Sequence, residues 1–516
     1  MDGTTCMRLA RDRANLFGVR RAFRLARATC RRHELRMADD FEWERVLSLA
    51  RDHALAYRRS LPTRPVAPSV TTEVVQRVLE RLDRLPADGC SAEQVLNELV
   101  EVASPGVTAM SGPRFFGWVT GGSLPAAVGA DWLTSIWDQN AGPATGAPAA
   151  AAFEAASLRW VVERLGLPAT ACGALVTGAM SANFVALATA RCHVLRAAGW
   201  DVEQQGLFQA PQIRVLVGHE RHTTIDKAVR LLGLGKKAMG FVQVDGQGRL
   251  ASHDLRRELQ RTTGPVIVCA QAGNVNSGAF DPLDEVGAVL AEHRKDRGAG
   301  DSWLHIDGAF GLWARATQSY AHLARGAELA DSWATDAHKF LNVPYDCGIA
   351  LTRHPRAHRR AMAIEGPYLS SGAERTAANP GVFAPELSRR ARGFALWAAL
   401  RQLGSRGLDD LVTRCCELAR LLATKLRSTQ GITILNDVVF NQVVVKLEAP
   451  PGCEAKEWTR RMALAIQTEG TCYPTPTIWR ATPALRFSVV NADTTPIDMA
   501  YSAAAVINVY ESHLRS

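Results

Sequence analysis

Lys339 is the residue of this chain best suited to covalent chemistry. It ends the run DAHK at 336–339, and Asp307 lies 32 positions upstream in the run HIDGA at 305–309. A lysine amine can hold an aldehyde as a Schiff base, and a nearby carboxylate keeps a pyridine nitrogen protonated by charge attraction. The pair is typical of enzymes that use pyridoxal phosphate (PLP). The chain has only eight lysines, so Lys339 has few rivals.

The segments around this pair alternate between short apolar runs and helical patterns. The clearest predicted strands are 214–218, 266–270 and 303–307, and helices are predicted at 181–198 and 282–297. Such alternation predicts a mainly parallel sheet with both faces covered by helices. Ligands of these sheets bind beyond the carboxyl ends of the strands. We therefore expect the site at that edge.

Three more polar motifs follow predicted strands. The turn VTGAMSAN at 176–183 could cradle a phosphate with backbone amides, or be only a tight turn before a helix. A histidine of HERHTT at 219–224 could stack on a ring, or be an ordinary polar residue. The asparagines of QAGNVNSGA at 271–279 could bind a ligand, or satisfy loop backbone. Their convergence with Asp307 and Lys339 favours a cofactor site.

Length and pattern predict several parts in this α/β chain, since 516 residues exceed one compact domain. We expect a basic tail at 1–37, a helical segment at 38–112, a PLP-binding large domain at 113–384 and a smaller α+β domain at 385–516. In the smaller domain, helices are predicted at 388–403 and 408–428 and strands at 433–435, 442–447 and 485–490.

The positive charge is concentrated at one end. Of the net charge of +9, residues 1–36 carry +7, from ten arginines against three acidic residues. The rest of the chain carries only +2. Nucleic-acid binding would therefore rest on the tail alone, and we expect none. The tail resembles a transit peptide, could be a basic arm, or could be upstream sequence before a working start at Met37; we favour the last.

The eleven cysteines form no CxxC pair or regular framework. This pattern favours reduced thiols over disulfides or zinc, so we expect a cytoplasmic protein without a bound metal. No apolar run is long enough to cross a bilayer, and we expect no membrane association.

These motifs together resemble the group II PLP-dependent amino acid decarboxylases, which include aromatic-L-amino-acid, glutamate and tyrosine decarboxylases. The resemblance runs from about residue 113 to the C-terminus, and its most specific runs are HIDGA at 305–309, DAHKFLN at 336–342 and PELSRR at 385–390. It implies the aminotransferase-like fold type I, a small-molecule amino acid substrate, and a homodimer with the active site at the interface.

The resemblance also implies roles for individual residues. Lys339 would form the Schiff base, Asp307 would pair with the pyridine nitrogen, and His222 would stack on the ring. Tyr368 would return a proton to Cα of the substrate. The remaining expected cofactor contacts are Ala309 beneath the ring, Gly178, Ala179, Met180 and His338 near the phosphate, and Asn274.

Several positions depart from the family pattern. Met180 replaces a serine or threonine of the phosphate turn, which removes a hydroxyl donor, and Ser181 replaces a glutamate. Phe340 stands where the family has tryptophan, and Gly112 where a histidine is frequent. None of these changes removes the Schiff-base residues.

The substrate pocket is expected to be formed by Phe116, Trp118, Val119 and Thr120. The aromatic residues among them favour, weakly, an aromatic amino acid, with core packing as the competing interpretation. Arg114 could instead indicate an acidic substrate, and Arg486 is interpreted as a domain-junction residue. Simple decarboxylation is favoured over an aldehyde synthase, which typically has phenylalanine at the position of Tyr368. An aminotransferase, or a non-catalytic protein that binds nucleic acid through the tail, is less favoured.

Overall fold

A computed structural model describes residues 40–80, 84–298, 300–363 and 379–515. The chain divides into two compact units, residues 1–109 and 110–516. In the first unit the helices are α2 (Asp40–Ser60), α3 (Thr72–Leu79) and α4 (Ala92–Ala103). Helix α4 begins at a capping box in which Ser91 and Gln94 satisfy each other's backbone amides. Across the described residues, no helix has the length and apolar character needed to cross a membrane.

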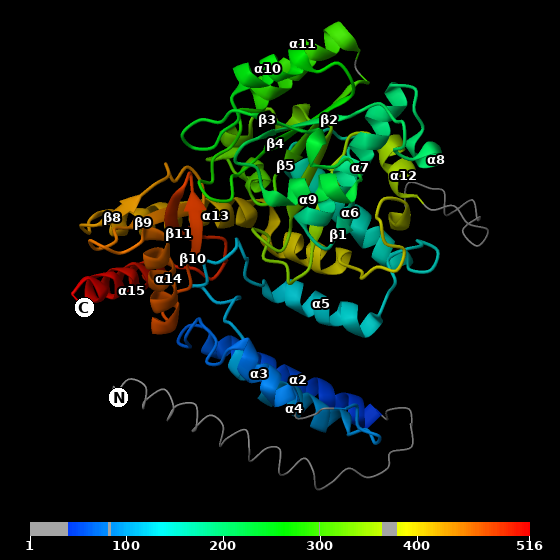
Figure 1. Ribbon diagram of the computed structural model, residues 1–516. Helices are drawn as coiled ribbons and strands as arrows, with labels where there is room; N and C mark the ends of the chain where they lie inside the picture. Colours follow the sequence, from blue (N-terminus) through cyan, green and yellow to red (C-terminus); the bar gives the residue numbers. More distant parts are fainter. Residues whose placement is uncertain (1–39, 81–83, 299, 364–378, 516) are drawn as a thin grey trace. The chain divides into compact units, whose positions relative to one another are not determined.

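The second unit is built on a seven-stranded sheet with the order β1-β7-β6-β5-β4-β2-β3 (Figure 1). Its strands are β1 (Cys172–Val176), β2 (Arg214–Gly218), β3 (Met239–Val242), β4 (Val266–Gln271), β5 (Ser302–Asp307), β6 (Ser332–Asp336) and β7 (Gly348–Thr352). Strands β3, β2, β4, β5 and β6 are all parallel to one another. Strand β7 runs antiparallel to both β6 and β1. Two reversals restore the direction, so β1 also ends at the carboxyl edge.

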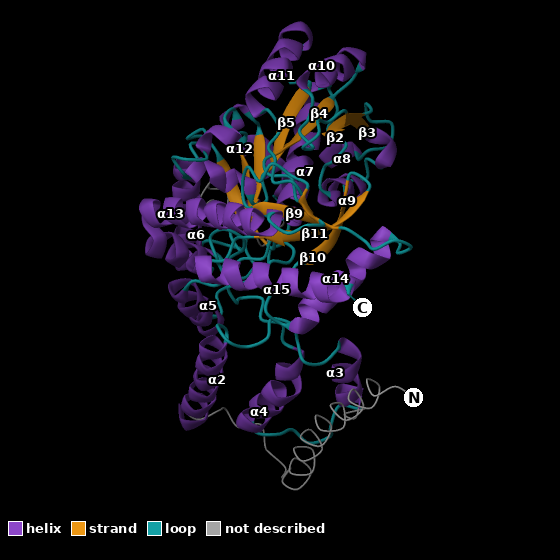
Figure 2. Ribbon diagram, turned by 90° about the vertical axis from the view of Figure 1, so that its left-hand side faces the viewer, coloured by secondary structure: helices purple, strands orange, loops and turns teal. Residues whose placement is uncertain are grey.

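Helices cover both faces of this sheet (Figure 2). One face packs against α7 (Ala179–Ala197) and α9 (Thr223–Leu231), whose apolar side chains join those of β2 in one buried cluster. The other face packs against α10 (Ser252–Arg261), α11 (Leu283–Arg297) and α6 (Pro148–Arg164) in a second cluster. The remaining helices before the small domain are α5 (Pro125–Trp137), α8 (Val202–Gln205) and α12 (Pro355–Met362). The predicted mainly parallel, doubly covered sheet is confirmed.

The C-terminal part adds a four-stranded antiparallel sheet with the order β10-β11-β9-β8. Its strands are β8 (Ile432–Ile434), β9 (Gln442–Leu447), β10 (Thr475–Trp479) and β11 (Thr482–Ser488), accompanied by α13 (Gly393–Arg427), α14 (Ala455–Glu469) and α15 (Pro496–Leu514). Backbone φ of 60° at Gly404 kinks α13, at the position where the sequence predicts a break between two helices. The sequence analysis missed β10. The boundary between domains at 384/385 stays a prediction.

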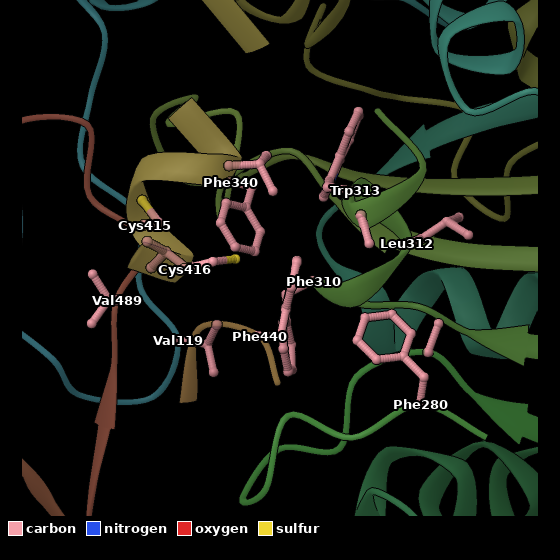
Figure 3. Packing of buried hydrophobic residues seen from close by; sticks show 14 of the residues in the cluster. Val119, Phe280, Phe310, Leu312, Trp313, Phe340, Cys415, Cys416, Phe440 and Val489 are labelled. Atoms are coloured by element: carbon pink, nitrogen blue, oxygen red, sulfur yellow. The ribbon is translucent and has the colours of Figure 1, made fainter. Parts of the chain in front are cut away.

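One apolar cluster connects the large sheet to the small domain (Figure 3). Phe340, the residue after Lys339, is fully buried, and its ring lies 5.4 Å from that of Phe440, which precedes β9. Cys415 and Cys416 of α13 belong to the same cluster. Because a packed core resists small displacements, this contact fixes the turn that carries Lys339.

Candidate active site

The carboxyl ends of five strands bring the predicted site residues to one edge of the large sheet. Asp307 ends β5 and Asp336 ends β6. The turns after β1, β2 and β4 carry Gly178, His222 and Asn274. The convergence expected from the sequence therefore follows from the strand directions alone, because all five strands end at the same edge.

Lys339 forms an ion pair with a carboxylate that sequence reasoning had given no role. Its Nζ lies 2.9 Å from Asp336 Oδ2, and Lys339 is held in the turn directly after β6. His338 Nε2 lies 3.5 Å from the same oxygen, and its Nδ1 accepts a hydrogen bond from Cys347 N at 3.2 Å. Burial lowers the pKa of His338. A neutral His338 does not compensate the charge of Asp336, so Lys339 does.

Asp307 is supported by a directional chain of buried hydrogen bonds. Its Oδ2 accepts from Asn183 Nδ2 at 3.0 Å, and His305 Nε2 lies 2.8 Å from Asn183 Oδ1. His305 Nδ1 is 2.9 Å from Ser332 Oγ, which accepts from Trp303 Nε1 at 2.8 Å. Burial lowers the pKa of His305 to about 4, so the ring is neutral near pH 7 and donates only from Nε2. The Asn183 amide must therefore point its NH2 group at Asp307.

The same amide reaches His222. Asn183 Nδ2 also donates to Thr224 Oγ1 at 3.2 Å, and Thr224 Oγ1 is 2.8 Å from His222 Nδ1. The backbone N–H of Thr224 donates to that Nδ1 at 3.3 Å, so the ring proton lies on Nε2. Burial, with smaller contributions from the charges of Lys339 and Arg486, lowers the pKa of His222. His222 is thus a neutral histidine with Nε2–H free of this network.

The turn before α7 has the features of an anion site. Gly178 is the N-cap of α7, and no side chain caps the first turn. A Cβ at Gly178 would lie 3.3 Å from His338 Cε1 and 3.6 Å from Asp336 Oδ1. The side chain of Met180 packs on the apolar cluster that contains α7. Free amides at a helix N-terminus favour a phosphate.

The expected pocket segment packs directly on the lysine turn. Gly121 N donates to His338 O at 3.3 Å, and a Cβ at Gly121 would lie 2.2 Å from Lys339 O. Trp118 and Val119 both have positive φ, 49° and 58°, an unusual backbone for side chains of this size. Such strain is retained where the surrounding structure fixes it.

The four predicted pocket residues have different environments. Phe116 and Val119 are 1% exposed and belong to the core cluster. Trp118 is 56% exposed and contacts the rings of Phe115 and Tyr473. Thr120 is a buried hydroxyl residue, and the ring of the nearby Tyr345 stacks on His338 with centroids 4.3 Å apart. Trp118 and Thr120 are thus the two members with a surface or polar contact to offer.

Arg114 has a carboxylate partner for its charge, whereas Arg486 has none among the described residues. Arg114 pairs with Asp498 of α15 at 3.0 Å and donates to Thr471 O at 2.8 Å, which gives it a structural role. Arg486 of β11 is buried and donates to Val275 O at 3.2 Å, and its Nε has no hydrogen-bond partner. No ion pair joins Arg486 to a carboxylate within the described ranges, and burial lowers its pKa to about 10. Arg486 thus connects β11 of the small sheet to the loop after β4 of the large sheet, and no described carboxylate compensates its charge.

A family model, described as the pyridoxal-dependent decarboxylase conserved domain, matches residues 78–448. The chain belongs to this family. It is 27% identical over 437 residues to the 4-hydroxyphenylacetaldehyde synthase of Rhodiola rosea, covering 82% of this chain and 85% of that protein. It is 25% identical over 466 residues to the aromatic-L-amino-acid decarboxylase of Bacillus atrophaeus, covering 87% and 91%. An acidic amino acid decarboxylase of Xenopus tropicalis is 28% identical over 332 residues, 63% of each.

Solved structures agree on the fold. The crystal structure of Oryza sativa TDC with PLP and tryptamine superposes with a TM-score of 0.84 at 22% identity, covering 93% of this chain and 100% of that one. The crystal structure of mouse CSAD gives a TM-score of 0.81 at 22% identity, covering 91% and 98%. The predicted aminotransferase-like fold type I, with its second smaller sheet, is confirmed.

The cofactor of this pyridoxal-dependent decarboxylase is PLP, and the described residues fit it. Lys339 offers an amine, Asp307 a buried carboxylate, and the α7 turn a set of free amides with small side chains. Ala309 N donates to Asp307 Oδ1 at 3.2 Å, which fixes the second carboxylate oxygen. Which atoms contact the cofactor stays a prediction for each of these residues.

Two predicted site residues need separate comment. The side chain of Asn274 is committed to loop structure: Nδ2 donates to Glu220 O at 2.9 Å, and Oδ1 accepts from Asn276 N and Ser277 N. Its cofactor contact stays a prediction. Tyr368 lies outside the described residues, as does the basic tail.

Sequence reasoning missed Asn183, Thr224 and Asp336 as parts of the site. Asn183 is fully buried in the second turn of an apolar helix, an unusual place for an amide, and that was the available signal. Thr224 follows His222 by two residues, the spacing of a local cap. Asp336 was visible as part of DAHK, three residues before Lys339.

Proposed function

We propose that this chain decarboxylates an L-amino acid with an aromatic side chain and releases the amine and carbon dioxide. The observation that carries the proposal is that Lys339 and the buried Asp307 lie at the same sheet edge in a member of this family. Bound PLP supplies the electron sink for the electrons left when carbon dioxide departs.

The chain's residues would divide the work. Lys339 would hold the cofactor through its Nζ, and Asp307, oriented by Asn183, would keep the ring nitrogen protonated by its charge. His222 would help to hold the ring and would offer Nε2–H, because its Nδ1 is occupied by Thr224. We assign the return of a proton to Cα to Tyr368. That residue also supports an amine as the product.

The aromatic preference rests on Trp118. Its largely exposed ring is on a strained segment that packs against the lysine turn, and Arg114, which could have indicated an acidic substrate, is occupied by Asp498. The aromatic-L-amino-acid decarboxylase of Bacillus atrophaeus is among the relatives.

An acidic amino acid is the second candidate, because Arg486 is a buried cation without a carboxylate partner within the described residues. A carboxylate of the substrate would compensate that charge. The relatives include an acidic amino acid decarboxylase.

A homodimer with the active site at the interface is proposed as well. Helix α5 exposes Trp132, Leu133, Ile136 and Trp137, each 42–51% exposed, on one helical face. Sedimentation velocity should give twice the mass of 55.9 kDa.

We also propose a cytoplasmic location, because the nine cysteines of the described ranges are all free.

One experiment tests the activity. PLP-loaded protein is incubated with single L-amino acids, and mass spectrometry identifies amine, aldehyde or neither. We expect amine from an aromatic amino acid, lost in Lys339→Ala and kept in Lys227→Ala, a matched change at an exposed lysine of α9. Aldehyde with hydrogen peroxide would replace the amine assignment. Turnover of acidic amino acids alone would favour the second candidate.

A further inference from the structure

We propose that Asp336 opposes cofactor loading: it holds Lys339 as the ammonium partner of a buried carboxylate, and this pair must separate before the amine can bond to the cofactor aldehyde. The inference concerns the unloaded protein. It rests on the family's cofactor and not on the proposed substrate, so it survives if the substrate is another amino acid.

The pair is short and buried. Nζ of Lys339 lies 2.9 Å from Asp336 Oδ2, with the side chains 16% and 3% exposed. Among the described residues, the groups within ion-pair distance of Asp336 are Lys339 and His338. Burial lowers the pKa of His338, which keeps that ring neutral. Lys339 is therefore the cation that compensates a carboxylate almost out of contact with water, where removing one partner is costly.

The backbone fixes the carboxylate in this place. Asp336 is the last residue of β6 and pairs with Gly348 of β7. Its N–H donates to Ala309 O at 2.9 Å, and its carbonyl accepts from Trp313 Nε1 at 3.0 Å. These bonds hold the backbone of Asp336 in place. Separation of the pair therefore comes from side-chain rotation, for which the longer side chain of Lys339 has the wider range.

The second carboxylate oxygen adds to the effect. Asp336 Oδ1 is buried and has no hydrogen-bond partner within the described residues. It lies 3.6 Å from the position of a Cβ at Gly178, at the turn before α7 that fits a phosphate. Once Lys339 has moved away, the carboxylate there is without its cation and repels a second anion. The two oxygens thus act in the same direction: one favours the unloaded lysine, and the other disfavours a phosphate.

The bonding step shows why the lysine must leave. The Lys339 nitrogen bonds to the aldehyde carbon with its lone pair, the aldehyde oxygen leaves as water, and the proton of the ammonium passes to solvent. While the nitrogen is an ammonium held by Asp336, it has no lone pair to offer. Loss of the carboxylate charge should therefore make both the rate and the equilibrium of loading more favourable.

The test uses the unloaded full chain and its Asp336→Asn variant, titrated with PLP and followed by the visible absorbance of the bound aldehyde. We expect the dissociation constant to fall at least five-fold and loading to become faster. Asp131→Asn is the matched control, since Asp131 pairs with Arg390 at 2.7 Å on the partly exposed surface of α5. The control should bind PLP like the parent.

Pyridoxal, which lacks the phosphate, separates the effect of the Lys339–Asp336 ion pair from the repulsion between Asp336 and the phosphate. The Asp336→Asn gain should persist with pyridoxal, because the lysine pair is broken in either case. Unchanged or weaker PLP binding would overturn the proposal, and so would a gain seen with PLP but absent with pyridoxal. Thermal unfolding of the unloaded protein verifies the fold. If Asp336→Asn does not fold, Asp336→Ser, which also removes the charge, replaces it.

Discussion

Asn183 donates its side-chain amide to Asp307 over 3.0 Å, and this bond joins two parts of the site that lie 124 positions apart in the chain. The amide is held on its other side by His305, and it reaches His222 through Thr224. One buried asparagine thus sets the orientation of the carboxylate expected at the pyridine nitrogen and the proton position of the histidine expected on the ring.

Replacing Asn183 should impair the orientation of Asp307 and of His222 together. In Asn183→Leu, which is similar in size, Asp307 loses a donor and His305 loses an acceptor, each worth about 1–3 kcal/mol when buried. We expect at least ten-fold weaker PLP binding and a ten-fold lower kcat, measured by absorbance titration and amine release. Asn97→Leu, on the exposed face of α4, is the control. Normal PLP affinity in Asn183→Leu would show that the amide does not position Asp307.

Under the second candidate function, Arg486 should bind the carboxylate of an acidic substrate and not the cofactor. In Arg486→Met the buried, uncompensated charge disappears while the aliphatic volume is largely kept, so the fold should be as stable or more stable. We expect KM for the amino acid to rise about ten-fold, the size of one lost charged hydrogen bond, with PLP affinity unchanged. A variant with unaltered KM would leave Arg486 with only its contact to Val275.

Trp118 should govern substrate size. Trp118→Ala removes an exposed ring beside the lysine turn, and we expect kcat/KM for an aromatic substrate to fall roughly ten-fold, as an aromatic contact of about 0.5–1.5 kcal/mol beyond area burial suggests. The same change at Trp43, an exposed tryptophan of α2, is the matched control. Equal losses in both variants would argue against a pocket role for Trp118.

The buried pair of Arg389 and Glu154 should contribute strongly to stability. Arg389 Nη2 lies 2.9 Å from Glu154 Oε1 and 2.6 Å from Leu175 O, with both side chains nearly unexposed. Arg389→Ala leaves a buried carboxylate without its cation, and we expect a loss of about 3–5 kcal/mol in unfolding free energy. Arg390→Ala, at a half-exposed pair with Asp131, should cost at most about 1 kcal/mol. Chemical denaturation measures both.

Stability should fall between pH 6.5 and pH 4. Burial lowers the pKa of His305 and of His358 to about 4, whereas the unfolded chain has ordinary histidines near 6.5. The unfolded state therefore binds more protons in this window, and each histidine costs up to roughly 3 kcal/mol once the pH is below 4. In His358→Gln the loss on acidification should be smaller, while His322→Gln, at an exposed histidine, should behave like the parent. A pH-independent melting temperature from 7 to 4.5 would contradict this.

The kink of α13 and the ends of the strands were predictable because their signals are local. Gly404 interrupts a helical pattern, and apolar runs of five or six residues ending in polar turns mark β2, β4 and β5. Strand β10 was missed because its alternation is short and includes Pro476. The pocket residues stay a prediction, and the structure adds that two of them, Phe116 and Val119, are 1% exposed.

The sequence by itself determined which groups are available: one lysine and one aspartate at a fixed spacing, a glycine turn and a histidine, each after a strand. Side-chain type and local pattern suffice for that. Tertiary structure decided which groups meet, namely Asn183 with Asp307 and with His305. Those meetings depend on strand register and on the position of α7 over the sheet, because contacts between residues far apart in sequence are fixed only when the core packs.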